Sequence, residues 1–193
     1  MTHQYGNTEK RQQIVETAYR LFKRDGFHAT GIDRIISDAD VAKMTMYLHF
    51  STKDALIVEV LRYRAARFER QLDELDTTSA TPDEKIAQIF DWYARWFQSS
   101  DFHGCVFQHA LAEFSNPEDP IFIIVAAQKN NLIDRMRQIL SASMPTSAAN
   151  SIAIALLLLL EGATMLAQMG QGEAAIHEAR EAAVRLVSSA GDA

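Results

Sequence analysis

Residues 26–56 of this chain read GFHATGIDRIISDADVAKMTMYLHFSTKDAL. The spacing of the apolar residues predicts two short helices, one that begins after Thr30 and ends near Asp38, and a second over about 42–48. Asp33 follows Thr30 at the distance of a capping pair. A three-residue turn at 39–41 joins the helices. This spacing is typical of a helix-turn-helix, which offers its second helix to the major groove of DNA.

The second helix carries side chains that suit DNA binding. Polar residues alternate with apolar ones, in the order Lys43, Met44, Thr45, Met46, Tyr47, Leu48, His49 and Phe50. Backbone N–H groups at two helix starts, 30–31 and 51–52, could bind phosphate, and Lys53 lies beside the second of them. The alternative is an ordinary solvated face on a small helical subdomain, and spacing alone leaves both readings open.

The rest of the chain is also predicted to be helical. Apolar periodicity indicates helices over about 8–25, 52–75, 82–99, 104–114, 120–140, 146–169 and 173–188, with a polar loop at 76–80. The helix over 52–75 is predicted to start after a cap at Ser51, with Asp54 three residues later. The clearest helix start is Thr81-Pro82-Asp83-Glu84, with a capping Thr, Pro at the first helical position and Glu at the third, as in a capping box. No alternating strand pattern is present. We expect an all-α fold of about nine helices, with a head at 1–52 and a body at 53–193.

Charge is divided unevenly along the chain. The net charge of the 193 residues is −6, yet residues 1–70 hold 12 Lys and Arg against 9 Asp and Glu, a balance of +3. A mildly basic head suits a polyanion. A single cysteine, Cys105, cannot form an intrachain disulfide, and the apolar run 152–160 is shorter than the roughly 20 residues that span a bilayer. We therefore expect a cytoplasmic protein without a membrane segment.

The residues of this stretch resemble the DNA-binding region of the tetracycline-repressor family. The most specific part is Tyr47…His49-Phe50…Lys53…Leu56, and the helix layout is similar over the full length. The resemblance implies a DNA-binding set, with Phe50 and Leu56 in the core. The implied set is Thr30, Gly31, Lys43, Met44, Thr45, Tyr47, His49 and Lys53.

Three positions depart from the family pattern. Asp40 stands where the turn usually has Gly, and Asp tolerates left-handed backbone better than most residues. Ala42 replaces a Ser or Thr cap, which weakens the second helix by about 1 kcal/mol. Met44 replaces a frequent Gly and adds bulk near the DNA. These changes concern base readout and leave the fold prediction intact.

The body is expected to hold a ligand and to pair two subunits. The resemblance implies a homodimer through the last two helices, and apolar residues surround much of the helix at 146–169. It also implies a repressor that a small apolar or amphipathic effector releases from a palindromic operator in double-stranded DNA. The predicted pocket residues are Trp92, Trp96, Phe107, Gln108, Phe114 and Met165.

A different trigger is the main alternative. Cys105, His109 and Glu113 fall at i, i+4 and i+8 on one helical face, and these side chains can bind zinc or, for the thiol, respond to oxidation. Ordinary packing is the competing explanation, and no cofactor is predicted. No nucleophile elbow, Walker loop, His-Glu-x-x-His motif or dinucleotide fingerprint is present, so we do not expect an enzyme.

Overall fold

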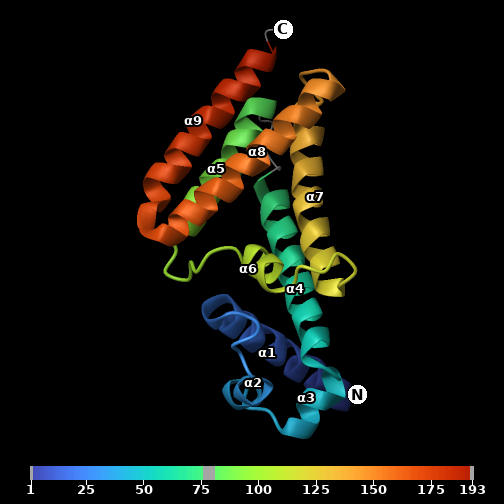
Figure 1. The fold of residues 1–193 in the computed structure, drawn as a ribbon. Helices are drawn as coiled ribbons and strands as arrows, with labels where there is room; N and C mark the ends of the chain where they lie inside the picture. Colours follow the sequence, from blue (N-terminus) through green and yellow to red (C-terminus); the bar gives the residue numbers. More distant parts are fainter. Residues whose placement is uncertain (1, 76–80, 192–193) are drawn as a thin grey trace. The chain divides into compact units, whose positions relative to one another are not determined.

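The computed structural model describes residues 2–75 and 81–191, and these residues form α-helices without a strand (Figure 1). The all-α prediction is confirmed. The predicted loop at 76–80 lies outside the described residues. The helices are α1 (Thr2–Asp25), α2 (Ile32–Asp38), α3 (Lys43–His49), α4 (Lys53–Leu75), α5 (Pro82–Phe97), α6 (Val106–Glu113), α7 (Pro120–Leu140), α8 (Thr146–Leu166) and α9 (Gly172–Gly191).

The helices pack into two compact units. Unit 1 comprises the chain up to Arg67 together with Cys105–Ala126, and unit 2 comprises Phe68–Gly104 and the chain from Ala127 onward. Unit 1 therefore contains α1 to α3, most of α4, and α6. A functional division at residue 52 stays a prediction, but packing groups a later segment of the chain with the first helices.

The core of unit 1 forms where α1 meets α2 and α3. Ile14, Ala18 and Phe22 lie one turn apart on α1 and are fully buried. Phe50 and Leu56 are also buried, as predicted. Gly26 ends α1 with φ +86°, and its N–H donates to the carbonyl of Phe22. Only glycine adopts this backbone conformation without strain, so the predicted helix end is confirmed.

The core of unit 2 is built mainly from α5, α8 and α9. The start of α5 has the capping box that the sequence predicted: the Thr81 hydroxyl accepts from the Glu84 N–H, and the Glu84 carboxylate accepts from the Thr81 N–H. Helices α8 and α9 form an antiparallel pair beside α5 (Figure 1). Buried small and branched residues such as Ala153, Leu156 and Ala179 fill the space between them.

A kinked segment at Ala167–Gln171 joins α8 to α9. Gly170 has φ +82° and reverses the chain there, close to the predicted break at 170–172. The helical stretch Thr146–Ala190 is long and apolar enough to cross a membrane. Length and composition alone are weak evidence for a membrane-spanning helix. The turn at Gly170 divides this stretch into two antiparallel helices, and α8 is buried along one face.

Candidate nucleic-acid interface

The turn between α2 and α3 has the geometry that a helix-turn-helix requires. Asp40 has φ +47°, and it is the one non-glycine residue with positive φ in the described part of the chain. The N–H of Asp40 donates to the carbonyl of Ser37, and the N–H of Val41 donates to that of Ile36. The prediction that Asp40 supports left-handed backbone is confirmed.

Helix α3 has a buried side and an exposed side. Met46 is fully buried and Phe50 is buried, so both residues pack α3 into the core of unit 1. Met44 is 82% exposed, Leu48 71% and Tyr47 46%. Lys43 lies next to this face, and its Nζ is 3.3 Å from Asp33 Oδ1 in an exposed ion pair. Because such pairs contribute little in water, Lys43 can exchange Asp33 for a phosphate.

Leu48 is the residue that the sequence interpretation missed. If every second residue of 43–50 faced the core, Leu48 would be buried together with Met46 and Phe50. A helix turns 100° per residue, so Leu48 lies above Met44, four residues earlier, and away from Met46. The helical period alone would have placed it on the exposed face.

His49 is less exposed than expected for a residue that contacts phosphate. It is half-buried, and its Nε2 is buried without a hydrogen-bond partner in the described part of the chain. Burial, and to a smaller extent the charge of Arg11, lowers the pKa of His49 below its ordinary value. The imidazole is therefore neutral near pH 7, and its predicted contact with DNA stays a prediction.

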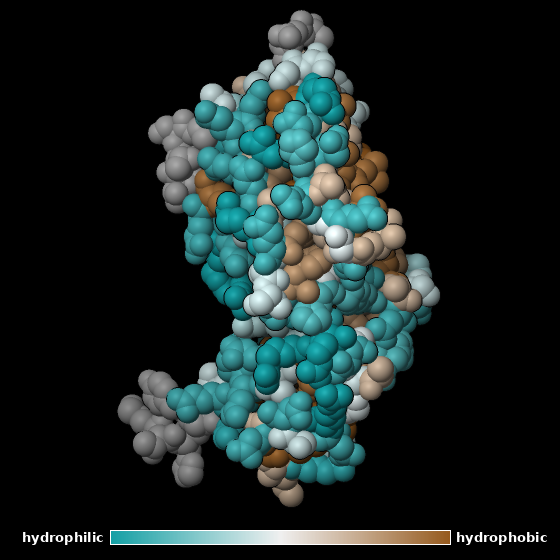
Figure 2. Space-filling view, turned by 90° about the vertical axis from the view of Figure 1, so that its left-hand side faces the viewer, coloured by the Kyte–Doolittle hydropathy of each residue, from teal (hydrophilic) through white to brown (hydrophobic). Residues whose placement is uncertain are grey.

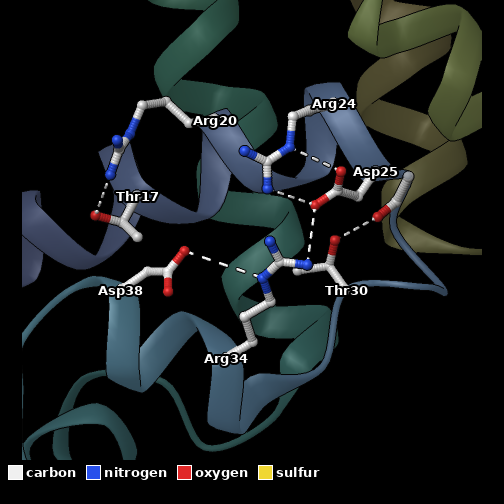
Figure 3. Close-up of polar contacts among 8 residues, drawn as sticks. Thr17, Arg20, Arg24, Asp25, Thr30, Arg34 and Asp38 are labelled. Atoms are coloured by element: carbon white, nitrogen blue, oxygen red, sulfur yellow. Dashed lines mark hydrogen bonds and ion pairs between the residues drawn. The ribbon is translucent and has the colours of Figure 1, made fainter.

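The predicted capping pair at Thr30 and Asp33 is wrong. The N-cap of α2 is Gly31, which makes no side-chain cap. The Thr30 hydroxyl is buried and donates instead to the Gly26 carbonyl, 2.7 Å away (Figure 3). A phosphate contact from Thr30 or Gly31 would therefore use backbone N–H groups at the start of α2.

The start of α4 offers a second set of donors. The Thr52 hydroxyl accepts from the Ala55 N–H, one residue later in the chain than the predicted cap at Ser51. Lys53 is half-buried, and its Nζ donates to the His28 carbonyl at 3.3 Å. These groups place one cation and the unpaired N–H groups of a helix start close together.

Ion pairs fix the position of α2 against the end of α1 (Figure 3). The guanidinium of Arg24 donates twice to Asp25, at 2.8 Å each. Arg34 Nη1 is 3.3 Å from the same carboxylate, and Arg34 Nε is 4.0 Å from Asp38. Arg34 therefore pairs with one carboxylate at the end of α1 and one at the end of α2.

Comparison with known proteins agrees with this geometry. Residues 14–60 match the family described as bacterial regulatory proteins, tetR family. The solved structure of a TetR-family transcriptional regulator from Streptomyces coelicolor superimposes with a TM-score of 0.90 and 25% identity, covering 95% of this chain and 97% of that one.

Residues 14–60 are a domain of the tetR family.

Curated relatives match part of this chain. The uncharacterized HTH-type transcriptional regulator YerO of Bacillus subtilis (strain 168) is 42% identical over 28% of this chain and 19% of its own length. The HTH-type transcriptional repressor DhaR of Mycobacterium sp. (strain GP1) is 25% identical over 59% of this chain and 57% of its own length. The first curated relatives are thus matched over a fifth to about half of their length. Their names are those of regulators, in agreement with the prediction that the chain is not an enzyme.

Glu113 connects α6 to the start of the helix-turn-helix within unit 1. Glu113 lies at the end of α6, and its two carboxylate oxygens accept from the N–H groups of Phe27 at 2.8 Å and His28 at 2.6 Å. His28 Nδ1 is 2.5 Å from Oε2, and the ring of Phe114 stacks on that of His28. Burial raises the pKa of Glu113, but the three hydrogen bonds outweigh it, so the pKa is below its ordinary value.

The predicted pocket residues do not come together in one unit. Phe107, Gln108 and Phe114 are in unit 1, whereas Trp92, Trp96 and Met165 are in unit 2. Phe114 packs against Phe27 and His28, and Met165 is 56% exposed. The pocket therefore stays a prediction.

Within unit 2, Trp92 and Trp96 belong to a continuous aromatic cluster. Their ring centroids are 5.7 Å apart, and the other members are Phe68, Tyr93, Phe97 and Phe102. A separate cleft of about 740 Å³ is lined mainly by polar residues of α4, α5 and α7 and touches none of the predicted pocket residues.

Glu113 is also one of the three weak metal candidates. Both of its carboxylate oxygens are already bound by the N–H groups after α1, and Cys105 is buried. Across residues 2–75 and 81–191, no cluster of three or more His, Cys, Asp or Glu side chains is placed to hold a metal ion. The structure therefore gives Glu113 a packing and capping role.

Proposed function

We propose that this chain is a dimeric repressor that binds a palindromic operator through α3 and is released by a small apolar or amphipathic molecule. The observation that carries the proposal is the outward face of α3, where Met44, Tyr47 and Leu48 are exposed beside Lys43 on a helix anchored by buried Met46. A helix held in this way can enter the major groove while the start of α4 holds phosphate.

Pairing of two subunits through α8 and α9 is supported by their exposed apolar side chains. Ile154, Leu158 and Met165 on α8 are each more than half exposed, and Val184 and Leu186 on α9 are 40% exposed. A groove of about 580 Å³ runs between these helices and is lined largely by Leu and Ala. A dimer that buries this face would present two helix-turn-helix units. A palindromic operator requires two such units about 34–36 Å apart.

The test of DNA binding is a selection from random duplexes followed by gel shifts at several salt concentrations. We expect one palindromic sequence to be enriched and the affinity to fall steeply with salt, because phosphate contacts release counterions. Lys53→Ala should lower the salt slope by about 1. Arg95→Ala, which removes an exposed cation of α5, is the matched control and should leave the slope unchanged. Binding without sequence preference would refute the proposal.

The effector is proposed to contact the aromatic cluster of α5. Trp92 and Trp96 are the two tryptophans of the chain, so intrinsic fluorescence reports on this cluster directly. A panel of apolar and amphipathic compounds should include one that changes the fluorescence and dissociates the protein from its operator over the same concentration range. A compound that releases DNA without any fluorescence change would place the effector elsewhere.

A further inference from the structure

We infer that Met44 and Leu48 read the C5-methyl groups of pyrimidines, thymine in unmodified DNA, in the major groove of each half-site. This inference rests on the proposed function and specifies what the α3 face recognises. Met44 and Leu48 are the two most exposed large apolar side chains in the described part of the chain. Exposing both costs the free protein solvation free energy, and neither contributes to the core.

The helix geometry places both side chains toward the same partner. Met44 and Leu48 are four residues apart on α3, whereas Met46, between them, is fully buried. In Figure 2, residues coloured tan to brown lie among teal ones at the lower edge of the view, where Figure 1 draws α3. Four residues advance about 6 Å along the helix axis, which corresponds to about two base-pair steps. Two methyl groups at that separation fit a helix that follows the groove.

The charges around this face favour DNA over an apolar protein or a membrane. Lys43 is next to Met44, Lys53 begins the following helix, and residues 1–70 carry a balance of +3 in a chain of net charge −6. In the major groove the apolar group that distinguishes one base pair from another is the pyrimidine C5-methyl. An apolar pair with Lys43 beside it and Lys53 at the start of the next helix therefore matches thymine methyls between two rows of phosphates.

The test replaces thymine by deoxyuridine, one position at a time, in the duplex selected as above, and measures binding to the full-length protein. Deoxyuridine removes the methyl group and keeps every hydrogen-bonding group. We expect one or two positions in each half-site at which the substitution weakens binding about four-fold per methyl. At those positions, exchanging the A·T pair for G·5-methylcytosine should bind about four-fold better than exchange for G·cytosine, because only the former keeps the methyl.

Protein variants assign each methyl to a side chain. In Met44→Ala, deoxyuridine should lose its effect at one position, and in Leu48→Ala at another about two base pairs away. Leu111→Ala removes an exposed leucine from α6 and should leave every deoxyuridine effect intact. Thermal unfolding of both α3 variants checks that they fold, which their exposure predicts.

The outcomes separate this inference from the proposal on which it rests. If no duplex is selected, the proposed function fails. If a duplex is selected but no deoxyuridine position changes binding, or the effects persist in both variants, the methyl readout is wrong while the proposed function stands. If the variants change the protein's mass in solution and leave the deoxyuridine effects unaltered, the face is a protein contact and the inference is overturned.

Discussion

The carboxylate of Glu113 stabilises a turn that lies far from it in the sequence, at Phe27 and His28. Its oxygens satisfy the N–H groups of Phe27 and His28, which follow the end of α1 and have no helical partner. Hydrogen bonds to a charged group are roughly twice as strong as neutral ones. The turn before the helix-turn-helix is therefore stabilised by a residue more than eighty positions later in the sequence.

Replacing this carboxylate should destabilise the protein measurably. Glu113→Gln keeps the shape but removes the charge from the bonds to Phe27 and His28, and we expect a loss of about 2 kcal/mol of unfolding free energy. Urea unfolding at pH 7 measures it. Glu118→Gln, at an exposed glutamate of unit 1, is the control and should lie within about 0.5 kcal/mol of the unchanged chain. Equal losses in both variants would contradict the role of Glu113.

The contribution of Glu113 should depend on pH. Its pKa is lowered in the folded state, so the unfolded chain binds the proton more tightly, and the stabilisation is complete above the ordinary glutamate value. It is then lost as pH falls through the lowered folded pKa. Urea unfolding from pH 7 to pH 3 should therefore show the difference between Glu113→Gln and the unchanged chain shrinking in acid. A difference that stays constant would rule out this linkage.

Helix α3 lacks a cap at its start, which limits how firmly it is held. Ala42 is the N-cap residue and makes no side-chain hydrogen bond. Ala42→Ser supplies a hydroxyl for the N–H of the second or third residue and should raise the unfolding free energy by about 1 kcal/mol. Thermal or urea unfolding measures this change. Ala29→Ser, at an exposed turn position, should have no such effect, and equal effects would assign the gain to the hydroxyl in general.

Local signals in the sequence located most elements but could not place every contact. The Pro120–Leu140 helix and the capping box at Thr81 were predicted correctly, because proline, capping residues and apolar period act within a few residues. Residues 2–7 lack an apolar pattern, so the prediction began α1 six residues late. The Thr30 cap failed because the hydroxyl found a closer acceptor at Gly26. The contact from Glu113 joins distant segments, and no local pattern signals it.

The proposed pairing of subunits gives a prediction about assembly. Leu158 is 68% exposed on α8 and lines the groove between α8 and α9. Leu158→Glu would place a charge in the apolar interface, so the mass from light scattering should fall from that of a dimer to that of one chain, and operator affinity should fall with it. Ile123→Glu changes a 53% exposed isoleucine of α7 in unit 1 and should preserve the mass. A dimer that survives Leu158→Glu with unchanged affinity would exclude this face.

The chain leaves unit 1 after Arg67 and returns to it at Cys105. A fragment that ends with the third helix, or even at Arg67, would therefore lack the carboxylate that caps the backbone after Asp25. Chimaeras that exchange only the first four helices between related regulators would separate the Glu113 carboxylate from the N–H groups of Phe27 and His28 that it binds. Grafts that carry segment 105–126 along with the N-terminal helices should fold and respond as one piece, and grafts without it should express as less stable proteins.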